Sequence, residues 1–327
     1  MDRLRYRAGI LPRVNPLGAS AEQPSSFFPD SFRAALIISA DCELAWAWRY
    51  TKALSDPLGY AIHRAEQSRR NFLELLALFD GYEIPVTWAV LGHLFLENCA
   101  RNNDRAHPEV QRIPYFDNEF WQYREGDWFD ADPCTDYQSD PAWYAPDLIQ
   151  AILNAKVKHE IACHSFSHID FSDGVCPPGI ADSELQKCQE IAREWGLELK
   201  SFVFPGNLVG NRASLKRFGF VAYRWHNGYE LDVPRQDDLG LWQIPGGVCW
   251  EKPTGWPMDA WIGALRRCVD QALETGTVLH LWFHPSCDST NVEKVFPAVL
   301  EEIACRHADL WVTTMGGLVN WLSSVGR

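Results

Sequence analysis

His164-Ser165-Phe166-Ser167-His168 closes the strand-like run of residues 157–162. A strand that ends in a turn or a first helical turn points the imidazoles at positions i and i+4 the same way. Two such rings can share one cation. This stretch therefore predicts a metal site at the end of a strand.

Two other strand-like runs also end in polar side chains. The apolar run 34–40 is followed by Asp41-Cys42-Glu43, and the run 277–283 is followed by His284-Pro285. In parallel α/β folds, functional side chains collect at the carboxyl ends of the strands. We therefore expect Asp41, His164 and His284 to meet at one end of the fold, as in a metal-assisted hydrolase.

The composition excludes several other classes of protein. The chain has 327 residues, of which 46% are apolar and 22% charged, so one large domain or two small ones could bury a substantial core. The net charge of −13 argues against a general affinity for nucleic acid or an anionic membrane. No apolar run approaches the roughly 18–20 residues that span a bilayer. Residues 1–28 have no uninterrupted apolar segment, so we do not expect a secretory signal.

Cysteines and aromatic residues add weaker indications. The ten cysteines are dispersed without paired spacing, which predicts reduced thiols and a cytoplasmic protein. The chain also contains 15 tryptophans, 17 phenylalanines and 10 tyrosines. Such rings can stack on the apolar face of a sugar, but they also fill cores. The aromatic excess alone does not decide between these uses.

Strand-like and helical segments alternate along most of the chain. We read residues 1–30 as an N-terminal arm and residues 31–327 as one domain. Within it, residues 100–145 have no sustained period and predict an insertion that caps one end of the domain. The predicted strands are 34–40, 84–91, 158–163, 201–204, 220–223, 277–283 and 310–313, and the predicted helices are 71–79, 146–155, 182–196, 212–218, 259–276, 292–304 and 318–325. This alternation predicts a parallel sheet covered by helices, either a barrel or a doubly wound sheet.

Strand alternation separates candidate ligands from their neighbours. Asp41 and Glu43 should share one side, with Cys42 turned away, and Cys163 should point away from His164. Both cysteines are therefore expected to be packed as small apolar residues. A set of two histidines and one carboxylate leaves positions on a cation open for water and substrate, as a catalytic site needs.

Amide hydrolysis assigns roles to the remaining residues. A bound divalent cation can lower the pKa of its water to about 7, a carboxylate takes the proton from that water, and an acid opposite protonates the leaving amine. Asp41 fits the base and His284 the acid, although His280 on the same strand face is an alternative to His284. We expect the other histidines to be surface or hydrogen-bonded core residues: His63, His93, His107, His159, His226 and His307.

Four motifs, in this order, resemble those of the polysaccharide deacetylase family (NodB homology, carbohydrate esterase family 4). They are Asp41-x-Glu43, His164-x-x-x-His168, the turn Phe204-Pro205-Gly206, and the segment 279–285 with the sequence LHLWFHP. The resemblance covers roughly residues 33–323. It implies a distorted (β/α)7-type barrel that holds one divalent metal ion, often zinc, at the carboxyl ends of its strands.

The resemblance also implies roles for individual residues. It makes Asp41 the base, His284 the acid, and Glu43, His164 and His168 the metal ligands. It places the oxyanion N–H on Gly206, with Asn207 beside it. Trp242 is the nearest candidate for a wall of the acetyl pocket.

The chain departs from the family pattern in the residue that orients the base. The family has an arginine two residues before the proline of the third motif, where this chain has Val203. Arg212, Arg224 or Arg49 could substitute for it in space. The metal carboxylate is also a glutamate where the family usually has an aspartate.

These observations lead to one preferred function and two alternatives. The preferred function is the metal-dependent removal of an N-acetyl group from an amino sugar or glycan, with metal-activated water as the nucleophile. The alternatives are hydrolysis of a small cyclic amide, as by an allantoinase or imidase, and non-catalytic carbohydrate binding on a hydrolase fold. Zinc is the first choice of cation, while cobalt, nickel, iron and manganese accept the same ligands. We expect no nucleic-acid partner and no integral membrane segment.

Overall fold

The computed structural model describes residues 13–14, 27–29, 31–52, 54–226 and 230–327. Most of the predicted N-terminal arm lies outside these residues, so its boundary at residue 30 stays a prediction. Within the arm, β1 (Arg13–Val14) pairs in parallel with β9 (Glu230–Leu231). Phe28 is buried in an apolar cluster.

Strands and helices alternate as the sequence predicts. The main strands are β2 (Ala34–Cys42), β3 (Thr87–Val90), β6 (Glu160–Cys163), β7 (Ser201–Val203), β8 (Ala222–Trp225), β11 (Trp242–Pro245), β13 (Val278–Phe283) and β14 (Leu310–Thr313), and the short ones are β4 (Phe116–Asp117), β5 (Gln122–Tyr123), β10 (Arg235–Gln236) and β12 (Val248–Cys249). The helices are α1 (Pro57–Gly81), α2 (Pro146–Leu153), α3 (Pro178–Glu194), α4 (Arg212–Arg217), α5 (Met258–Thr275), α6 (Phe296–Ala304) and α7 (Met315–Ser324), with shorter turns η2 (Gly92–Phe95), η3 (Pro205–Asn207) and η4 (Asn291–Val295).

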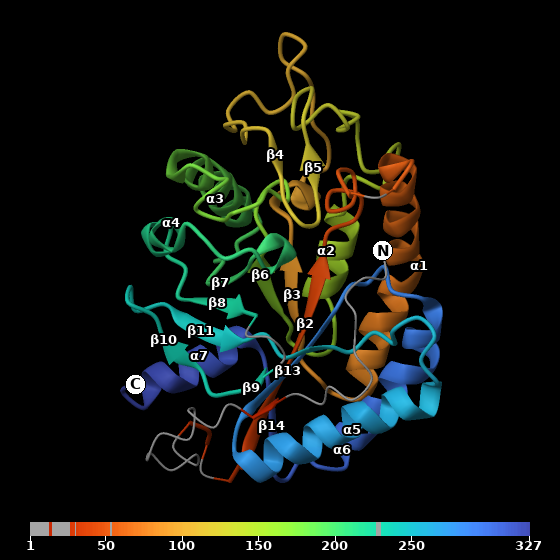
Figure 1. The fold of residues 1–327 in the computed structure, drawn as a ribbon, viewed down its shortest axis with the longest axis vertical. Coiled ribbons are helices and arrows are strands. Elements are labelled where there is room, and N and C mark those ends of the chain that lie inside the picture. The colour runs from red at the N-terminus through yellow and green to blue at the C-terminus, as the bar shows by residue number, and fades with distance from the viewer. Residues whose placement is uncertain (1–12, 15–26, 30, 53, 227–229) are drawn as a thin grey trace.

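The main sheet is parallel except at one edge and curls into a half-barrel (Figure 1). Its strands follow the order β10-β11-β8-β7-β6-β3-β2-β13-β12, in which only β10 runs antiparallel to its neighbour. β14 pairs with the first half of β2, and β3 pairs with the second half. The expected distorted α/β barrel is confirmed.

A kinked segment links the two edges of this sheet. β11 pairs with β8, and after Gly246 and Gly247 the chain continues as β12, which pairs with β13. A Cβ on Gly247 would lie only 1.9 Å from the carbonyl oxygen of His280. The strand can therefore cross so close to β13 only because this position is glycine.

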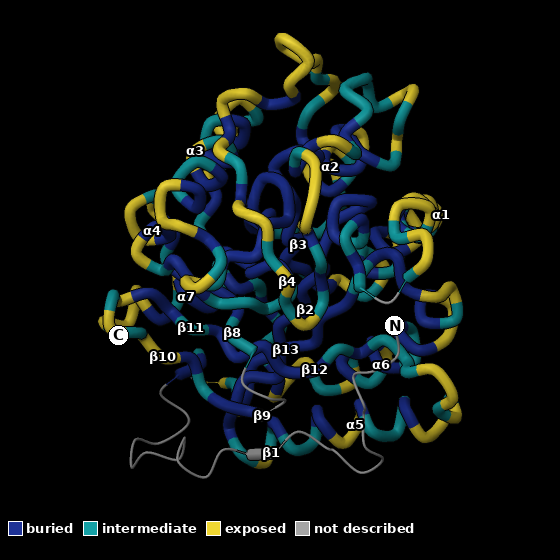
Figure 2. The backbone as a smooth tube through the Cα atoms, turned by 45° about the horizontal axis from the view of Figure 1, so that its top comes forward, coloured by how far each residue is buried: buried dark blue, intermediate teal, exposed yellow. Residues whose placement is uncertain are grey.

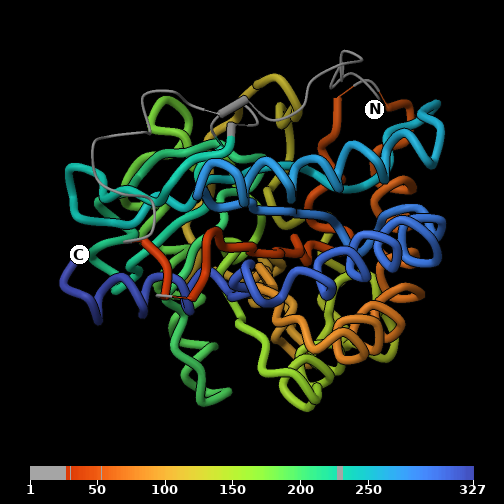
Figure 3. Tube along the Cα trace, turned by 90° about the horizontal axis from the view of Figure 1, so that it is seen from below, coloured from red at the N-terminus to blue at the C-terminus, as the bar shows by residue number. Residues whose placement is uncertain are grey.

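β2 is the central strand, and all nine of its residues are buried. Its even-numbered side chains from Leu36 to Cys42 belong to the main core cluster, together with α1 residues such as Phe72. Ala35 and Ile37 belong to a second cluster, and Ser39 and Asp41 continue this face of the strand. Figure 3 shows β2 in red near the middle of the molecule, with helices on either side. One face of β2 thus packs against helices. The other face is apolar at the start of the strand and polar at its carboxyl end.

Helix starts differ from the predicted ones where a proline begins the helix. α1 starts at Pro57, well before the predicted residue 71, with Asp56 accepting a hydrogen bond from the Gly59 N–H at 2.8 Å. α3 starts at Pro178 instead of residue 182. Proline fits the first helical position because the N–H it lacks has no partner there. The predicted end of α5 is confirmed, since Gly276 caps it in the left-handed conformation.

Residues 100–145 lie beyond the carboxyl ends of the central strands, where Figure 1 shows them in yellow around the labels β4 and β5. The insertion is anchored beside β2, because Thr51 bridges Trp121 and the Lys52 N–H donates to the Phe120 carbonyl at 2.9 Å. Figure 2 shows exposed loops at its outer edge and buried chain beneath them. Within the described residues, no helix has both the length and the apolar character required to cross a bilayer.

Candidate active site

Five side chains from three distant segments meet at the carboxyl ends of the strands. Asp41 and Glu43 come from the end of β2, His164 and His168 from the turn after β6, and His284 from the loop after β13. The Nε2 atoms of His164 and His168 each lie 3.1 Å from Glu43 Oε1. One donor atom each of Asp41, Glu43 and His284 lies within 4.8 Å of the other two. The structure thus brings together the five residues that the sequence predicted at the strand ends.

The two neighbouring cysteines lie outside this group, as strand alternation predicted. Cys42 and Cys163 are buried in the main core cluster. Burial raises the pKa of the Cys42 thiol to about 12. These thiols pack as small apolar side chains and take no part in the site.

The turn that carries His164 and His168 is stabilised by a buried carboxylate beneath it. Ser165 and His168 both have positive φ angles, 69° and 61°, so this segment is an irregular turn and not a helix. Glu184 of α3 is fully buried beneath it and accepts hydrogen bonds from the Phe166 N–H at 2.8 Å, the Ser167 N–H at 2.9 Å and the Ser167 hydroxyl at 2.6 Å. A strained turn persists only where its surroundings determine it, and Glu184 does this here.

The donor atoms of Glu43, His164 and His168 fit a cation. His164 Nδ1 lies 2.7 Å from the Val203 carbonyl, which can only accept, so Nδ1 carries the proton. In the neutral ring, Nε2 then turns a lone pair toward Glu43 Oε1, which also carries lone pairs. Burial lowers the pKa of His168, which favours its neutral form as well. A positive ion between these atoms would satisfy them all, as in sites with two histidines and one carboxylate.

Arg224 of β8 orients Asp41. Its two terminal nitrogens each lie 2.6 Å from a different oxygen of the Asp41 carboxylate, and one of them also donates to Asn207 Oδ1 at 3.1 Å. Burial would raise the pKa of Asp41, but the charge and hydrogen bonds of Arg224 hold that pKa below its ordinary value. The carboxylate is therefore ionised and fixed in orientation.

The other two candidate arginines have different partners. Arg212 pairs with Asp237 at 2.8 Å and Asp238 at 2.5 Å. Arg49 lies under the insertion, with its guanidinium 4.4 Å from the centre of the Trp128 ring. Of the three alternatives left open by the sequence, the structure selects Arg224.

His284 has a carboxylate partner that the sequence analysis did not name. Both its backbone N–H and its Nδ1 lie 2.8 Å from Glu251 Oε1. Burial would lower the pKa of His284, but Glu251, with smaller contributions from Glu43 and Asp41, raises it to about 9. Asn71 of α1 holds the same loop by donating to the carbonyls of Pro285 and Cys287 at 2.7 and 2.9 Å.

His280 does not compete with His284 for a place in the site. It is fully buried, with Nε2 2.8 Å from Ser39 Oγ and Nδ1 3.0 Å from the Pro245 carbonyl. Burial, helped by the charge of Arg224, lowers its pKa to about 3. His280 is thus a neutral core residue beneath Asp41 and Arg224.

The turn Phe204-Pro205-Gly206 lies against the insertion. Gly206 has a φ of 59°, and a Cβ there would lie 2.8 Å from Cη2 of Trp121. The Trp121 ring is also 5.0 Å from the ring of His168. The N–H groups of Asn207 and Leu208 donate within the turn to Phe204 and Pro205. The insertion therefore reaches the Gly206 turn through Trp121, and it reaches the histidine turn through Trp128, whose indole N–H donates to Ser167 Oγ at 2.9 Å.

Trp242 does not lie in the site, which corrects the expectation that it walls the acetyl pocket. It is the first residue of β11 and packs with Met315 and Leu318 in the second apolar cluster, near the amino ends of the strands. Two other tryptophans lie beside His284 instead. The centres of the Trp48 and Trp282 rings are 5.6 and 5.5 Å from the centre of the His284 ring.

Comparisons with known proteins agree with this architecture. No family model matches the chain, and no curated protein matches it. Among solved structures, a candidate polysaccharide deacetylase from Mycobacterium smegmatis superposes with a TM-score of 0.64 at 18% identity, covering 91% of this chain and 93% of the other. PuuE allantoinase gives 0.65 at 15% identity, covering 95% and 96%. A candidate polysaccharide deacetylase from Pseudomonas aeruginosa PAO1 gives 0.65 at 14% identity, covering 95% and 97%.

The chain has the polysaccharide deacetylase fold. Motifs that resemble those of the polysaccharide deacetylase family predicted this fold, and the strand pattern located the polar residues at the strand ends. They did not predict Glu251, Glu184 and Trp121, which support these residues from other segments. Glu251 and Glu184 are single carboxylates in segments with no motif, and Trp121 lies in the aperiodic insertion. For Trp121, the only signal in the sequence was that an aromatic residue lies in a long aperiodic loop. That signal does not predict which residues Trp121 contacts.

Proposed function

We propose that this protein is a metal-dependent hydrolase that removes the N-acetyl group from an amino sugar or glycan. The observation that carries the proposal is the arrangement of Asp41 and His284 around the group Glu43, His164 and His168. A base and an acid beside one candidate cation site are what amide hydrolysis requires. Zinc is the cation we propose, and the cytoplasm remains the proposed location.

Each group of the chain has a distinct task in this chemistry. The cation, when bound, polarises the acyl oxygen and makes water acidic enough to ionise near neutral pH. Asp41, held ionised by Arg224, takes the proton of the attacking water. The Gly206 N–H donates to the oxygen that becomes negative. His284 is protonated at neutral pH, because its pKa is raised to about 9, and gives its proton to the leaving amine.

Aromatic side chains favour a sugar as the substrate. Trp48 and Trp282 lie beside His284, and Trp121 lies beside His168. Indole rings provide flat apolar surfaces on which a pyranose can stack. Trp48 is the one of these three rings that is not buried, so it is the ring on which the sugar of an N-acetyl substrate would stack.

Hydrolysis of a small cyclic amide is the second candidate function. The fold is shared with an allantoinase, and the insertion packs onto the Gly206 turn through Trp121, which would suit a small substrate. The third alternative, non-catalytic sugar binding, was motivated by the missing arginine. Arg224, which donates to both oxygens of Asp41, can take that role, and this favours the hydrolase over the third alternative.

The experiment compares substrates and variants in parallel. Purified protein loaded with Zn²⁺ is incubated with N-acetylglucosamine, with its β-1,4 oligomers and with allantoin, while acetate release and ring opening are measured. We expect acetate release, reduced by about 10²- to 10⁴-fold in Asp41→Asn. Asp309→Asn, at an exposed position far along the chain, is the control and should be unaffected. Ring opening without acetate release would select the second candidate, and equal rates for Asp41→Asn and wild type would refute the roles assigned here.

A further inference from the structure

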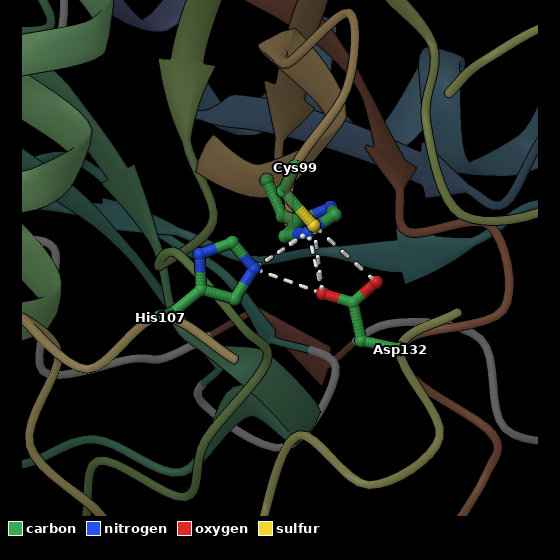
Figure 4. A group of neighbouring side chains, drawn as sticks. Cys99, His107 and Asp132 are labelled. Atoms are coloured by element: carbon green, nitrogen blue, oxygen red, sulfur yellow. Dashed lines mark hydrogen bonds and ion pairs between the residues drawn. The ribbon is translucent and has the colours of Figure 1, made fainter. Parts of the chain in front are cut away.

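A second group of metal-ligating side chains lies outside the proposed active site. One donor atom each of His93, Cys99, His107 and Asp132 lies within 4.8 Å of the other three. Figure 4 shows the donor atoms of Cys99, His107 and Asp132 pointing toward one another. His93 lies on η2, which follows β3 of the barrel, whereas His107 and Asp132 belong to the insertion. The group therefore joins two parts of the chain.

Three of the donor atoms form a closed triangle. His93 Nε2 is 3.1 Å from His107 Nε2 and 3.0 Å from Asp132 Oδ2, and the last two atoms are 2.8 Å apart. Cys99 Sγ is 3.5 Å from the same oxygen. Bond lengths to zinc of about 2.1 Å for nitrogen or oxygen and about 2.3 Å for sulfur give tetrahedral edges of roughly 3.4 and 3.6 Å. The distance from Cys99 Sγ to Asp132 Oδ2 matches the longer edge, and the triangle of nitrogen and oxygen atoms is slightly tighter than the shorter edge.

Hydrogen bonds alone cannot provide a proton for every close contact among the three atoms of this triangle. His93 Nδ1 lies 3.1 Å from the Trp143 carbonyl, so this nitrogen carries the proton and Nε2 of the neutral ring has a lone pair. A neutral His107 supplies at most one Nε2 proton to the two lone-pair atoms that face it. His93 and Asp132 are almost completely buried, so no solvent reaches these atoms. Lone pairs thus face one another away from water.

The surroundings orient the donors as a metal site requires. Asp132 Oδ1 accepts hydrogen bonds from the Tyr144 hydroxyl at 3.1 Å and the Cys134 N–H at 2.9 Å, which leaves Oδ2 for the triangle. The Tyr144 hydroxyl is also 3.2 Å from Cys99 Sγ. Such outer hydrogen bonds fix the orientation of ligands around a metal.

We propose that His93, Cys99, His107 and Asp132 bind a structural zinc ion. Four protein donors fill a tetrahedral zinc ion and leave no position for substrate, which distinguishes a structural site from a catalytic one. Cys99 binds as the thiolate, and its proton passes to solvent. From the sequence, His93 and His107 were predicted to be surface or hydrogen-bonded core residues; as zinc ligands they would be neither.

Zinc at this position would tie the insertion to the active site. On the same η2 turn, the N–H groups of Gly92 and His93 donate to the carbonyls of Ser165 and Phe166, at 2.8 and 3.1 Å. The zinc ion would thus support the catalytic histidine turn from one side and fix the insertion that carries Trp121. This role does not depend on which amide the protein hydrolyses.

Metal analysis of the purified protein tests the stoichiometry. After dialysis against a weak chelator, we expect two equivalents of zinc in the wild type. His164→Ala should lose the active-site ion and keep one equivalent. If His164→Ala, shown by circular dichroism to be folded, holds no metal, the proposal is overturned.

Cobalt substitution tests the ligands themselves. Co²⁺ bound to a thiolate has a near-ultraviolet charge-transfer band, and the proposed active site offers no thiolate. We expect this band in Co²⁺-loaded His164→Ala, its loss on adding Cys99→Ala, and its retention on adding Cys134→Ala, at a second partly buried cysteine close by. Absence of the band in His164→Ala, or its loss with Cys134→Ala but not with Cys99→Ala, would refute the site.

Discussion

At the scale of single residues, the proposed site contains pairs of charged groups whose partners fix both protonation and orientation. Arg224 keeps Asp41 ionised, and Glu251 keeps His284 protonated. One group with a lowered pKa and one with a raised pKa can act as base and acid at the same pH. Each pair can be tested by changing the partner and leaving the reacting group in place.

Arg224→Lys should shift the acidic limb of the pH–rate profile to higher pH. Lysine keeps the charge but not the two-point contact, so the pKa of Asp41 rises and the base becomes protonated at a higher pH than in the wild type. Complete removal of the guanidinium would cost about 3–5 kcal/mol of stability by leaving a buried charge without its partner, which is why lysine is preferred. Kinetics from pH 4 to 8 measure the shift, and Arg212→Lys should leave that limb in place. An unchanged limb in Arg224→Lys would contradict the assignment.

Glu251→Gln should shift the alkaline limb to lower pH. His284 loses the charge that does most to raise its pKa to about 9, so the proposed acid loses its proton earlier as the pH increases. In the wild type, the pair of Glu251 and His284 stabilises the folded protein fully at pH values below the ordinary histidine pKa of 6.5. This stabilisation is lost as the pH rises through about 9. Activity between pH 7 and 10 measures the limb. A limb that stays in place would show that His284 is not the acid.

At the scale of elements, two irregular turns carry the proposed site, and residues from other elements hold each turn. Glu184 of α3 accepts three hydrogen bonds from the histidine turn. Trp121 of the insertion packs on Gly206. Neither turn is held by ladder hydrogen bonds of the sheet, so its geometry depends on these contacts.

Glu184→Gln should weaken cation binding at the active site. An amide retains one acceptor oxygen where a carboxylate accepts three hydrogen bonds, so the turn that carries His168 loosens. We expect a loss of affinity of about 10- to 100-fold, measured by competition with a fluorescent zinc chelator. Glu194→Gln, at the exposed end of the same helix, is the matched control. Equal affinity in both variants would mean that Glu184 has no part in holding the turn.

Gly206→Ala should reduce the turnover rate without removing the cation. The left-handed conformation costs a residue with a Cβ about 1–2 kcal/mol, and the added methyl group would meet Trp121 at 2.8 Å. Gly196→Ala has a similar φ of 69° with no heavy atom within 4 Å of the new Cβ, so it isolates backbone strain. Urea denaturation and acetate release separate the two effects. If both variants lose turnover equally, the contact with Trp121 does not matter.

At the scale of the whole molecule, the sequence predicted the fold and named the residues at the strand ends, but of the supporting residues it offered only Arg224, as one of three alternatives. The runs that became β2, β6 and β13 are recognisable because buried parallel strands are nearly continuous apolar segments, and polar residues at their ends stand out. Glu184, Glu251 and Arg224 are distant in sequence from the residues they hold. Their pairing is set by the curvature of the sheet, which local patterns do not encode. Trp242 was wrongly placed because its position along β11 depends on where that strand starts.

Loss of the proposed structural zinc should expose the insertion while the barrel stays folded. We expect Cys99→Ala to be cut by trypsin within residues 100–145, for example after the exposed Arg124, faster than the wild type. Cys268→Ala, at a buried cysteine of α5, should be cut at the wild-type rate. Mass spectrometry of the fragments locates the cuts. Equal resistance of the insertion in Cys99→Ala would show that no metal holds it in place.

The most direct test of the account is a crystal structure of the zinc-loaded protein with anomalous scattering recorded on both sides of the zinc absorption edge. We predict a peak about 2.1 Å from Glu43 Oε1 and from Nε2 of His164 and His168, with Asp41 and His284 on either side of it. A well-ordered map with no peak at that position, and with both imidazoles hydrogen-bonded directly to Glu43, would contradict the central claim.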